Sequence, residues 1–116
     1  NTSALTIMGE SQSVLRVLNN LLQNAVQAIE HNTTPQITIN TFKNDEPMAV
    51  IEIEDNGKGI PAERRTQLFK YQFSSKTSGS GMGLMLSQEL MKAMGGQIEY
   101  YEPVLGGTGF RLFFKV

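Results

Sequence analysis

The sequence contains no cysteine among its 116 residues. The fold therefore cannot rely on disulfide bonds, and neither a thiolate metal site nor a cysteine nucleophile is available. No apolar run approaches the roughly 20 residues that a membrane-spanning helix needs, and no signal peptide is visible. These absences fit a reducing compartment, and we expect a cytoplasmic domain that makes no membrane contact of its own.

An excess of charge of either sign is also absent. The formal net charge is −1, which gives no electrostatic reason to expect binding to nucleic acid or to an anionic membrane. The hydrophobic fraction of 40% is typical of a globular chain. The first residue is asparagine rather than methionine, so we expect residues 1–116 to be one domain cut from a longer protein. A membrane anchor, where the parent has one, would lie outside this domain.

Several common signatures of nucleotide and metal sites are missing too. The P-loop pattern G-x-x-x-x-G-K-[ST] does not occur, and the spacing of Gly79, Gly81 and Gly83 does not fit the dinucleotide pattern G-x-G-x-x-G. No H-E-x-x-H motif or other cluster of histidine, aspartate and glutamate suits zinc. The sequence therefore argues against P-loop, dinucleotide-binding and zinc proteins.

The most prominent feature is a glycine-rich stretch at residues 75–84, SKTSGSGMGL, which runs into an apolar segment with helical character. Glycine lets the backbone approach an anion closely, and the start of a helix offers unpaired N–H groups and a positive dipole end. This combination predicts a phosphate site, and a plain connector is the alternative. No apolar periodicity spans residues 74–80, where we expect a mobile lid.

Residues 14–29 carry apolar side chains at the spacing of an amphipathic helix. Asn20, Asn24 and Gln27 lie at positions i, i+4 and i+7, so their carboxamides form a separate polar stripe. Asparagine is a poor helix former, and a solvated face usually carries lysine, glutamate or arginine. We therefore interpret the stripe as one side of a polar site. The expected apolar stripe consists of Leu18, Leu21, Leu22, Ala25 and Ile29.

Residues 48–55 alternate in the manner of a β-strand. Ala49, Ile51 and Ile53 would face the core, and by the same period of two Asp55 points to that side. A carboxylate facing a core costs several kcal/mol unless it is paired. Asp55 must therefore have donors around it or bind a ligand that donates to it. The alternative is an aspartate that starts the following turn.

The remaining segments predict a mixture of helices and strands. Strands that are joined by short turns must be antiparallel. The predicted fold is therefore a two-layer α/β sandwich, with a mixed, mostly antiparallel sheet and its helices on one face. We expect further strands at residues 4–8, 36–42, 97–102 and 110–116, helices at 61–68 and 82–94, a left-handed cap at 95–96 and a tight turn at 106–109.

Five short motifs follow one another along nearly the whole chain. They are NLLQNA at 20–25, DNGKG at 55–59, Phe69 and Phe73 before Ser75-Lys76, GSGMGL at 79–84 and GTGF at 107–110. In this order they resemble the N, G1, F and G2 boxes and the final glycine–threonine turn of the catalytic ATP-binding domain of sensor histidine kinases. That domain has the Bergerat fold, shared with gyrase, heat-shock chaperones and mismatch-repair ATPases. The N box looks most like that of nitrogen-regulation kinases.

The resemblance implies that the domain binds ATP, with ADP as the product. Asp55 would accept the exocyclic amine of adenine. Gly57 and Gly59 would let the backbone pass close to the base. Ala28 and Thr108 would border the adenine pocket, and Gln27 and Ile60 would also belong to the nucleotide-binding site.

At the phosphate end, the resemblance implies that Asn24 places its side-chain oxygen on Mg²⁺, a hard cation that suits an amide oxygen. Asn20 would reach the phosphates or order water beside them, and Lys76 would act as a point charge. These three would be the catalytic residues, while Phe69 and Phe73 would anchor the lid. The lid residues that would contact the nucleotide are Gly79, Ser80, Gly81, Met82, Gly83 and Leu84.

The position of Asn20 carries a glutamate general base in the hydrolysing relatives, and an amide cannot take a proton. The resemblance therefore implies phosphoryl transfer to a histidine rather than efficient hydrolysis. His31 is the only histidine and is expected at the surface after the first helix. The acceptor would lie on a separate histidine-containing dimerisation domain of the same parent, with a response regulator downstream.

Two alternative functions remain open. The first is a nucleotide-sensing binding module of the same fold without transferase activity, motivated by the missing general base and the missing acceptor. The second is a serine kinase that acts on a regulatory protein. Such kinases usually carry a glutamate where this chain has Asn20, which disfavours the second alternative.

Overall fold

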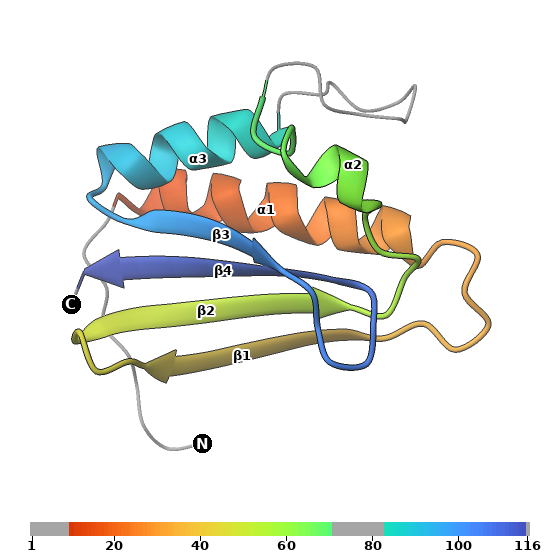
Figure 1. Cartoon of the computed structure of the whole chain (residues 1–116). Helices are drawn as coiled ribbons and strands as arrows, with labels where there is room; N and C mark the ends of the chain where they lie inside the picture. Colours follow the sequence, from red (N-terminus) through yellow and green to blue (C-terminus); the bar gives the residue numbers. More distant parts are fainter. Residues whose placement is uncertain (1–9, 71–82, 116) are drawn as a thin grey trace.

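The computed structural model describes residues 10–70 and 83–115, and Figure 1 draws the others as a thin grey trace. The expected strand at 4–8 and most of the glycine-rich stretch lie outside the described residues. The described elements are, in order, α1 (Ser11–Ala28), β1 (Ile37–Lys43), β2 (Met48–Asp55), α2 (Ala62–Arg65), α3 (Gly83–Ala93), β3 (Gln97–Tyr101) and β4 (Thr108–Lys115).

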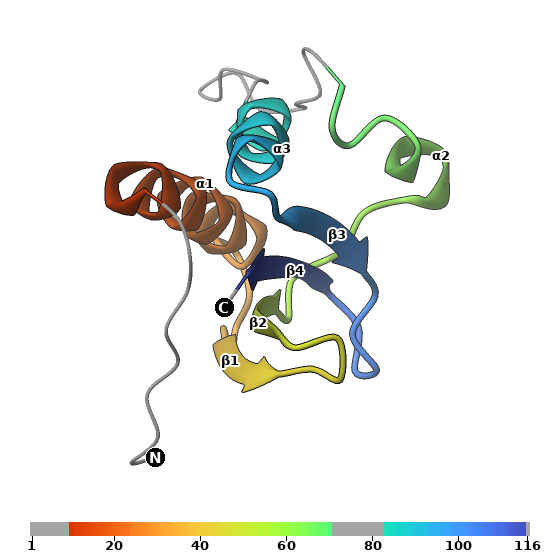
Figure 2. The same ribbon diagram turned by 90° about the vertical axis from the view of Figure 1, so that its left-hand side faces the viewer.

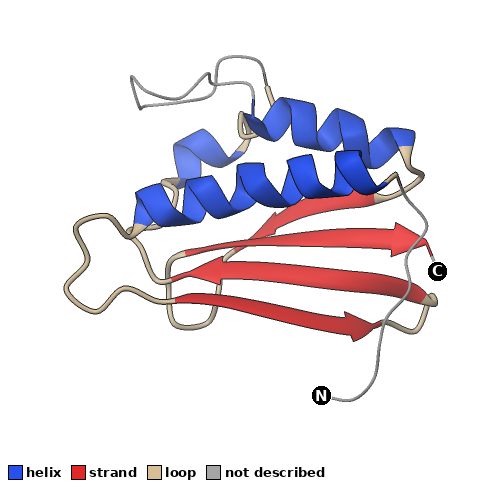
Figure 3. Cartoon of the chain, turned by 180° about the vertical axis from the view of Figure 1, so that it is seen from behind, coloured by secondary structure: helices blue, strands red, loops and turns tan. Residues whose placement is uncertain are grey.

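The strands form one four-stranded sheet in the order β1-β2-β4-β3, and all neighbouring strands pair antiparallel. Figure 1 and the quarter turn in Figure 2 show that α1, α2 and α3 lie on one face of this sheet. Figure 3 shows the same two layers from behind. The predicted two-layer α/β sandwich is therefore confirmed, and the described sheet contains no parallel pair.

Helix α1 begins at Ser11, three residues before the predicted start, because the carbonyl of Glu10 accepts from the N–H of Val14 at 3.0 Å. The buried face of α1 consists of Val17, Leu21 and Ala25. The predicted stripe contained two of these residues and missed Val17. Leu18 and Leu22 are only partly buried, at the margin of the core.

Strand β2 has the predicted bounds, and its inward side is confirmed. Ala49, Ile53 and Asp55 are 0%, 3% and 7% exposed. Strand β1 lies at the edge of the sheet, and Ile39 on it is 53% exposed. This exposure arises because α1 packs against β2 and α3 against β3, so the helical layer leaves the β1 edge partly uncovered.

The second predicted helix is shorter than expected. Only Ala62–Arg65 is α-helical, and no residue of it is buried. The chain then turns and brings Leu68 into the core, where it is 1% exposed. A continuous helix over 61–68 is therefore wrong, since the core position of Leu68 is reached through a turn.

Helix α3 ends as the glycines predict. Gly95 has a φ of +78°, its N–H donates to the carbonyl of Lys92, and the N–H of Gly96 donates to that of Met91. This is a Schellman termination, which favours glycine because the φ is positive. The expected tight turn at 106–109 is displaced, however. Thr108 and Gly109 already belong to β4 and pair with β2, so the turn lies at 103–107.

The hydrophobic core lies between the two layers. No helix in the described ranges is long and apolar enough to cross a membrane. The buried apolar side chains of the core cluster are Val17, Leu21, Ala49, Ile53, Leu68, Leu84, Met91, Ile98, Phe110, Leu112 and Phe114.

Replacing a phenylalanine of the core by alanine should lower the free energy of unfolding far more than the same replacement at the edge of the sheet. Phe114 is 1% exposed, and we expect Phe114→Ala to lower the free energy of unfolding by about 3–5 kcal/mol. Phe42→Ala is the matched control, because this side chain on β1 is 41% exposed and its loss should cost much less. Urea unfolding of both variants measures the difference, and equal losses would contradict this description of the core.

Candidate functional site

The candidate site begins at the end of β2, where Asp55 pairs in register with Thr108 of β4. The N–H of Gly57 donates to Oδ1 of Asp55 at 2.9 Å, and the backbone N–H of Thr108 also bonds to this carboxylate. Both interpretations of Asp55 therefore hold. The side chain faces the core side of the sheet, and it also starts the following turn.

Burial raises the pKa of the Asp55 carboxyl above its ordinary value, and the N–H groups of Gly57 and Thr108 act in the opposite direction. An ionised carboxylate has about four acceptor positions. Two backbone donors leave room for a further donor from outside. The end of β2 therefore holds a buried acceptor that can bind an N–H or O–H of a ligand.

Glycines bring three segments together around this carboxylate. A Cβ on Gly57 would lie 2.4 Å from the carbonyl oxygen of Ala28, so the turn after β2 packs directly on the end of α1. A Cβ on Gly107 would lie 1.9 Å from the carbonyl oxygen of Asp55, and one on Gly59 would lie 3.1 Å from that of Gly107. Among the predicted residues, the structure thus assembles Ala28, Asp55, Gly57, Gly59 and Thr108.

The sequence analysis missed an asparagine pair that holds this turn in place. The side chain of Asn56 donates to the carbonyl of Thr34 and accepts from the N–H of Gln36, at 2.8 and 2.9 Å. The side chain of Asn32 donates to the Asn56 carbonyl at 2.8 Å. These bonds join the loop after α1 to the turn after β2. Asn32 carries no local signal for this role, because its partner is 24 residues away.

Two members of the predicted polar stripe, Asn20 and Asn24, precede Ala28 on the side of α1 that runs from the Asp55 end of the site toward α3. Asn20, Asn24 and Ala28 are spaced by four residues, so they line one side of the helix over about 12 Å. The side chain of Asn20 is half-buried, and its Nδ2 donates to the Gly83 carbonyl at 3.3 Å and to Oγ of Ser87 at 3.2 Å. The side chain of Asn24 is exposed. Ser87 was not predicted.

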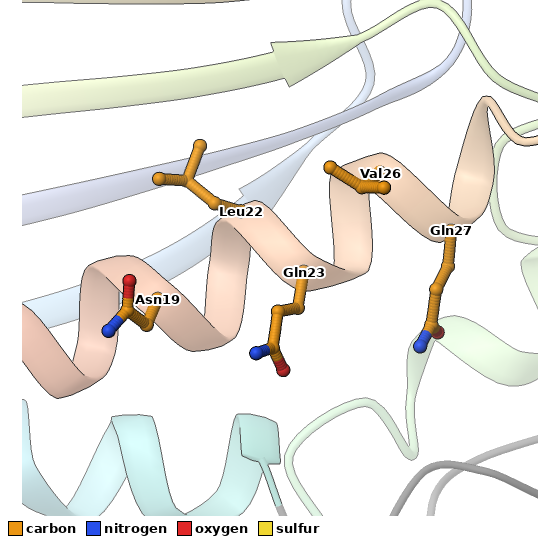
Figure 4. A pocket seen from close by; sticks show the side chains of 5 residues that line it. All are labelled: Asn19, Leu22, Gln23, Val26 and Gln27. Carbon is orange, nitrogen blue, oxygen red and sulfur yellow. The ribbon is translucent and has the colours of Figure 1, made fainter.

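Gln27 lies beside a different feature. An open hollow on the surface of α1 is lined by Asn19, Leu22, Gln23, Val26 and Gln27. Figure 4 shows Leu22 and Val26 pointing to one side of the helix and Gln23 and Gln27 to the other. No other predicted site residue lines this hollow, so it is distinct from the surroundings of Asp55.

Arg65, another residue that the sequence did not predict, supports the segment after the turn. Its Nε donates to the carbonyl of Ile60 at 3.0 Å, and its guanidinium lies 3.6 Å from the Glu102 carboxylate and 5.5 Å from the ring centre of Tyr100. Ile60, one of the predicted residues, packs against the core. Arg65 thus connects Ile60 to β3. An arginine in a short exposed helix gives no sequence signal for this role.

The remaining predicted residues fall into two groups. Gly83 and Leu84 form the first turn of α3, and the Leu84 side chain packs in the core. His31 is exposed, as expected. No group of three metal-ligating histidine, cysteine, aspartate or glutamate side chains occurs in the part of the chain that the structure describes. The expected lid at 74–80 lies outside it, as do Lys76, Gly79, Ser80, Gly81 and Met82.

Asp55→Asn should change how stability depends on pH. Below the unfolded-state pKa of 3.8 the carboxyl is protonated in both states, and its burial adds no ionic cost. As the pH rises through the higher folded-state pKa, the ionised form costs the wild-type fold free energy that the amide does not. We expect the unfolding free energy of the variant to rise relative to wild type from about pH 3 to pH 7. Urea unfolding along this pH series tests it, and a constant difference would contradict the shift.

The chain is similar to known proteins of one family. Residues 9–116 match the family model described as histidine kinase-, DNA gyrase B-, and HSP90-like ATPase. The signal transduction histidine-protein kinase AtoS of Escherichia coli K12 is 39% identical over 110 residues, 95% of this chain. The sensory histidine kinase/phosphatase NtrB of Vibrio alginolyticus is 31% identical over 119 residues, also 95% of the chain. The chain spans 18% and 34% of the lengths of these two relatives.

Solved structures show the same fold. The mycobacterial sensor histidine kinase MprB superposes with a TM-score of 0.79 at 26% identity, over 93% of this chain and 75% of that one. The catalytic domain of the histidine kinase ThkA also gives 0.79, at 25% identity over 92% of this chain and 68% of the other. The chain belongs to the histidine kinase-, DNA gyrase B- and HSP90-like ATPase family, as a catalytic ATP-binding domain of the sensor histidine kinase type.

Proposed function

We propose that this domain binds ATP with Mg²⁺ and donates the γ-phosphoryl group to a histidine on a separate dimerisation domain of its parent protein. That protein would serve a two-component pathway and act on a response regulator. Family membership supports ATP as the substrate. The observation that carries the proposal is the buried Asp55 carboxylate, which has acceptor capacity left beside Ala28, Gly57 and Thr108.

Adenine recognition would follow from this arrangement. The exocyclic amine of adenine is a donor, and Asp55 is an acceptor on a rigid central strand with 7% exposure. The space beside Gly57 is filled by the backbone and Cβ of Ala28, so this glycine lets the turn after β2 pack against the end of α1 next to the carboxylate. A base whose amine meets the Asp55 carboxylate would then lie beside this tightly packed turn.

Mg²⁺ would be held mainly by the nucleotide. The described residues contain no cluster of three acidic or histidine ligands, so a protein-only cage is not available in them. Mg²⁺ usually keeps waters and phosphate oxygens and takes one or two protein oxygens. The exposed carboxamide of Asn24 on α1 fits that limited role. When bound, the ion would neutralise charge on the phosphates.

Transfer rather than hydrolysis is supported by the chemistry of Asn20. Its carboxamide cannot take a proton from water, and its Nδ2 is engaged by the Gly83 carbonyl and by Ser87. The side chain is thus suited to positioning a phosphate or a water molecule. Phosphoryl transfer depends chiefly on positioning and charge neutralisation, which such a site can supply.

The proposal predicts acid-labile labelling of an acceptor histidine. The chain would be incubated with ATP labelled in the γ-phosphoryl group, Mg²⁺ and the separately expressed acceptor domain, with calorimetry of ATP binding in parallel. We expect both binding and transfer. Asp55→Asn should weaken ATP binding, because the amide N–H of asparagine would face the exocyclic amine of adenine, which is also a donor. Binding without transfer would support the nucleotide-sensing module instead, and no binding would overturn both functions.

Asn24→Ala should act through the metal. We expect the variant to lose most of the Mg²⁺-dependent part of ATP affinity, because its exposed side chain supplies one oxygen ligand and little packing. Calorimetry with Mg²⁺ and with EDTA separates the two parts of the affinity. Gln23→Ala on the same helix is the control, since that exposed residue lines the separate hollow. Equal loss with and without Mg²⁺ would rule out the ligand role.

A further inference from the structure

The contact between α1 and α3 has an unusual polar centre. The buried side of α3 consists of Leu84, Ser87 and Met91, and Ser87 is the polar member, with 0% exposure. Burying a hydroxyl costs free energy unless it is hydrogen-bonded. Here the Ser87 Oγ accepts from Nδ2 of Asn20 at 3.2 Å. The hydroxyl thus ties α3 to Asn20, which the family resemblance would place at the phosphates.

The partners of Asn20 determine which way its carboxamide points. Nδ2 lies 3.3 Å from the carbonyl oxygen of Gly83, and a carbonyl can only accept a hydrogen bond. The opposite orientation would set two acceptor oxygens against each other. The nitrogen therefore faces α3. Oδ1, on the other branch of the amide, takes no part in these two hydrogen bonds.

Among the described residues, Gly83 places no side chain beside this amide. A Cβ at this position would lie 3.8 Å from Cγ and 4.0 Å from Oδ1 of Asn20, in van der Waals contact with both atoms. Glycine adds no side-chain atom at that position. The oxygen can then accept a hydrogen bond from a water molecule beside the phosphates, or from another donor there.

We propose that Ser87 is a positioning residue that, with the Gly83 carbonyl, holds the Asn20 carboxamide with its oxygen toward the phosphates. This inference rests on the proposed function and adds to it a residue that does not touch the nucleotide. Ser87 removes the freedom of the amide to rotate or flip. The nitrogen is used for structure, and the oxygen remains available for the reacting groups.

The test compares three variants in the chain together with its acceptor domain. Ser87→Ala removes one of the two acceptors of Nδ2, and Ser87→Thr retains a hydroxyl. Met91→Leu is the control. Met91 lies one turn further along the same buried face, and its replacement by leucine nearly conserves the side-chain volume. The readouts are the rate of phosphoryl transfer, the affinity for ADP and the NMR signals of the Asn20 side-chain amide.

We expect Ser87→Ala to lower the transfer rate by roughly threefold to tenfold, the effect of one lost hydrogen bond. Its affinity for ADP should change less than about twofold, because the base end of the site is untouched. The Asn20 amide signals should move in Ser87→Ala and stay in place in Met91→Leu. Ser87→Thr should recover most of the rate.

The outcomes separate this inference from the proposed function. A wild-type chain that binds no nucleotide, or that transfers nothing, contradicts the proposed function itself. Wild-type transfer together with an unchanged rate and unchanged Asn20 signals in Ser87→Ala overturns the role of Ser87. If Ser87→Ala does not fold, Ser87→Cys replaces it, because a thiol has a similar shape and accepts a hydrogen bond only weakly. An unchanged transfer rate together with unchanged Asn20 signals in that variant would overturn the role of Ser87.

Discussion

The structure depends on one constraint, which is the burial of the Asp55 carboxylate at the end of a central strand. An unpaired carboxylate in this place would cost several kcal/mol. The N–H of Gly57 and that of Thr108 reduce this cost, and both are present only when β2 pairs with β4 and the turn folds back. The Asp55 carboxylate therefore keeps its two donors only while this part of the fold is intact. Gly57 and Gly107 stand beside it at positions where a Cβ would strike backbone atoms.

Helix α1 connects the two ends of the candidate site. Its last residue, Ala28, supports the turn that surrounds Asp55, and Asn20, two turns earlier, is bonded to the start of α3. One helix thus sets the separation between the surroundings of Asp55 and those of Asn20, the two ends of the proposed nucleotide site. Because Val17, Leu21 and Ala25 anchor that helix in the core, the geometry of the site rests on ordinary apolar packing.

Local patterns were sufficient for much of this arrangement. Period-two alternation predicted β2 and the inward direction of Asp55. Of the predicted stripe of Asn20, Asn24 and Gln27, Asn20 has polar partners on α3, Asn24 is exposed and Gln27 lines a separate hollow. Predictions failed where a distant contact decides the outcome. The helix after Pro61 ends early so that Leu68 can enter the core, and Thr108 joins β4 because it pairs with β2. Neither effect is visible in the neighbouring residues.

The sequence by itself determined the class of fold and the kinds of side chain at the site, because periodicity and glycine spacing are local properties of the chain. Only the tertiary structure decided which partners those side chains have. Asn20 meets Ser87 across 67 residues, and Asn32 meets Asn56 across 24. Such pairs form only when helices and loops pack against each other, because a hydrogen bond requires its two atoms within about 3 Å, and spacing along the chain does not specify that distance.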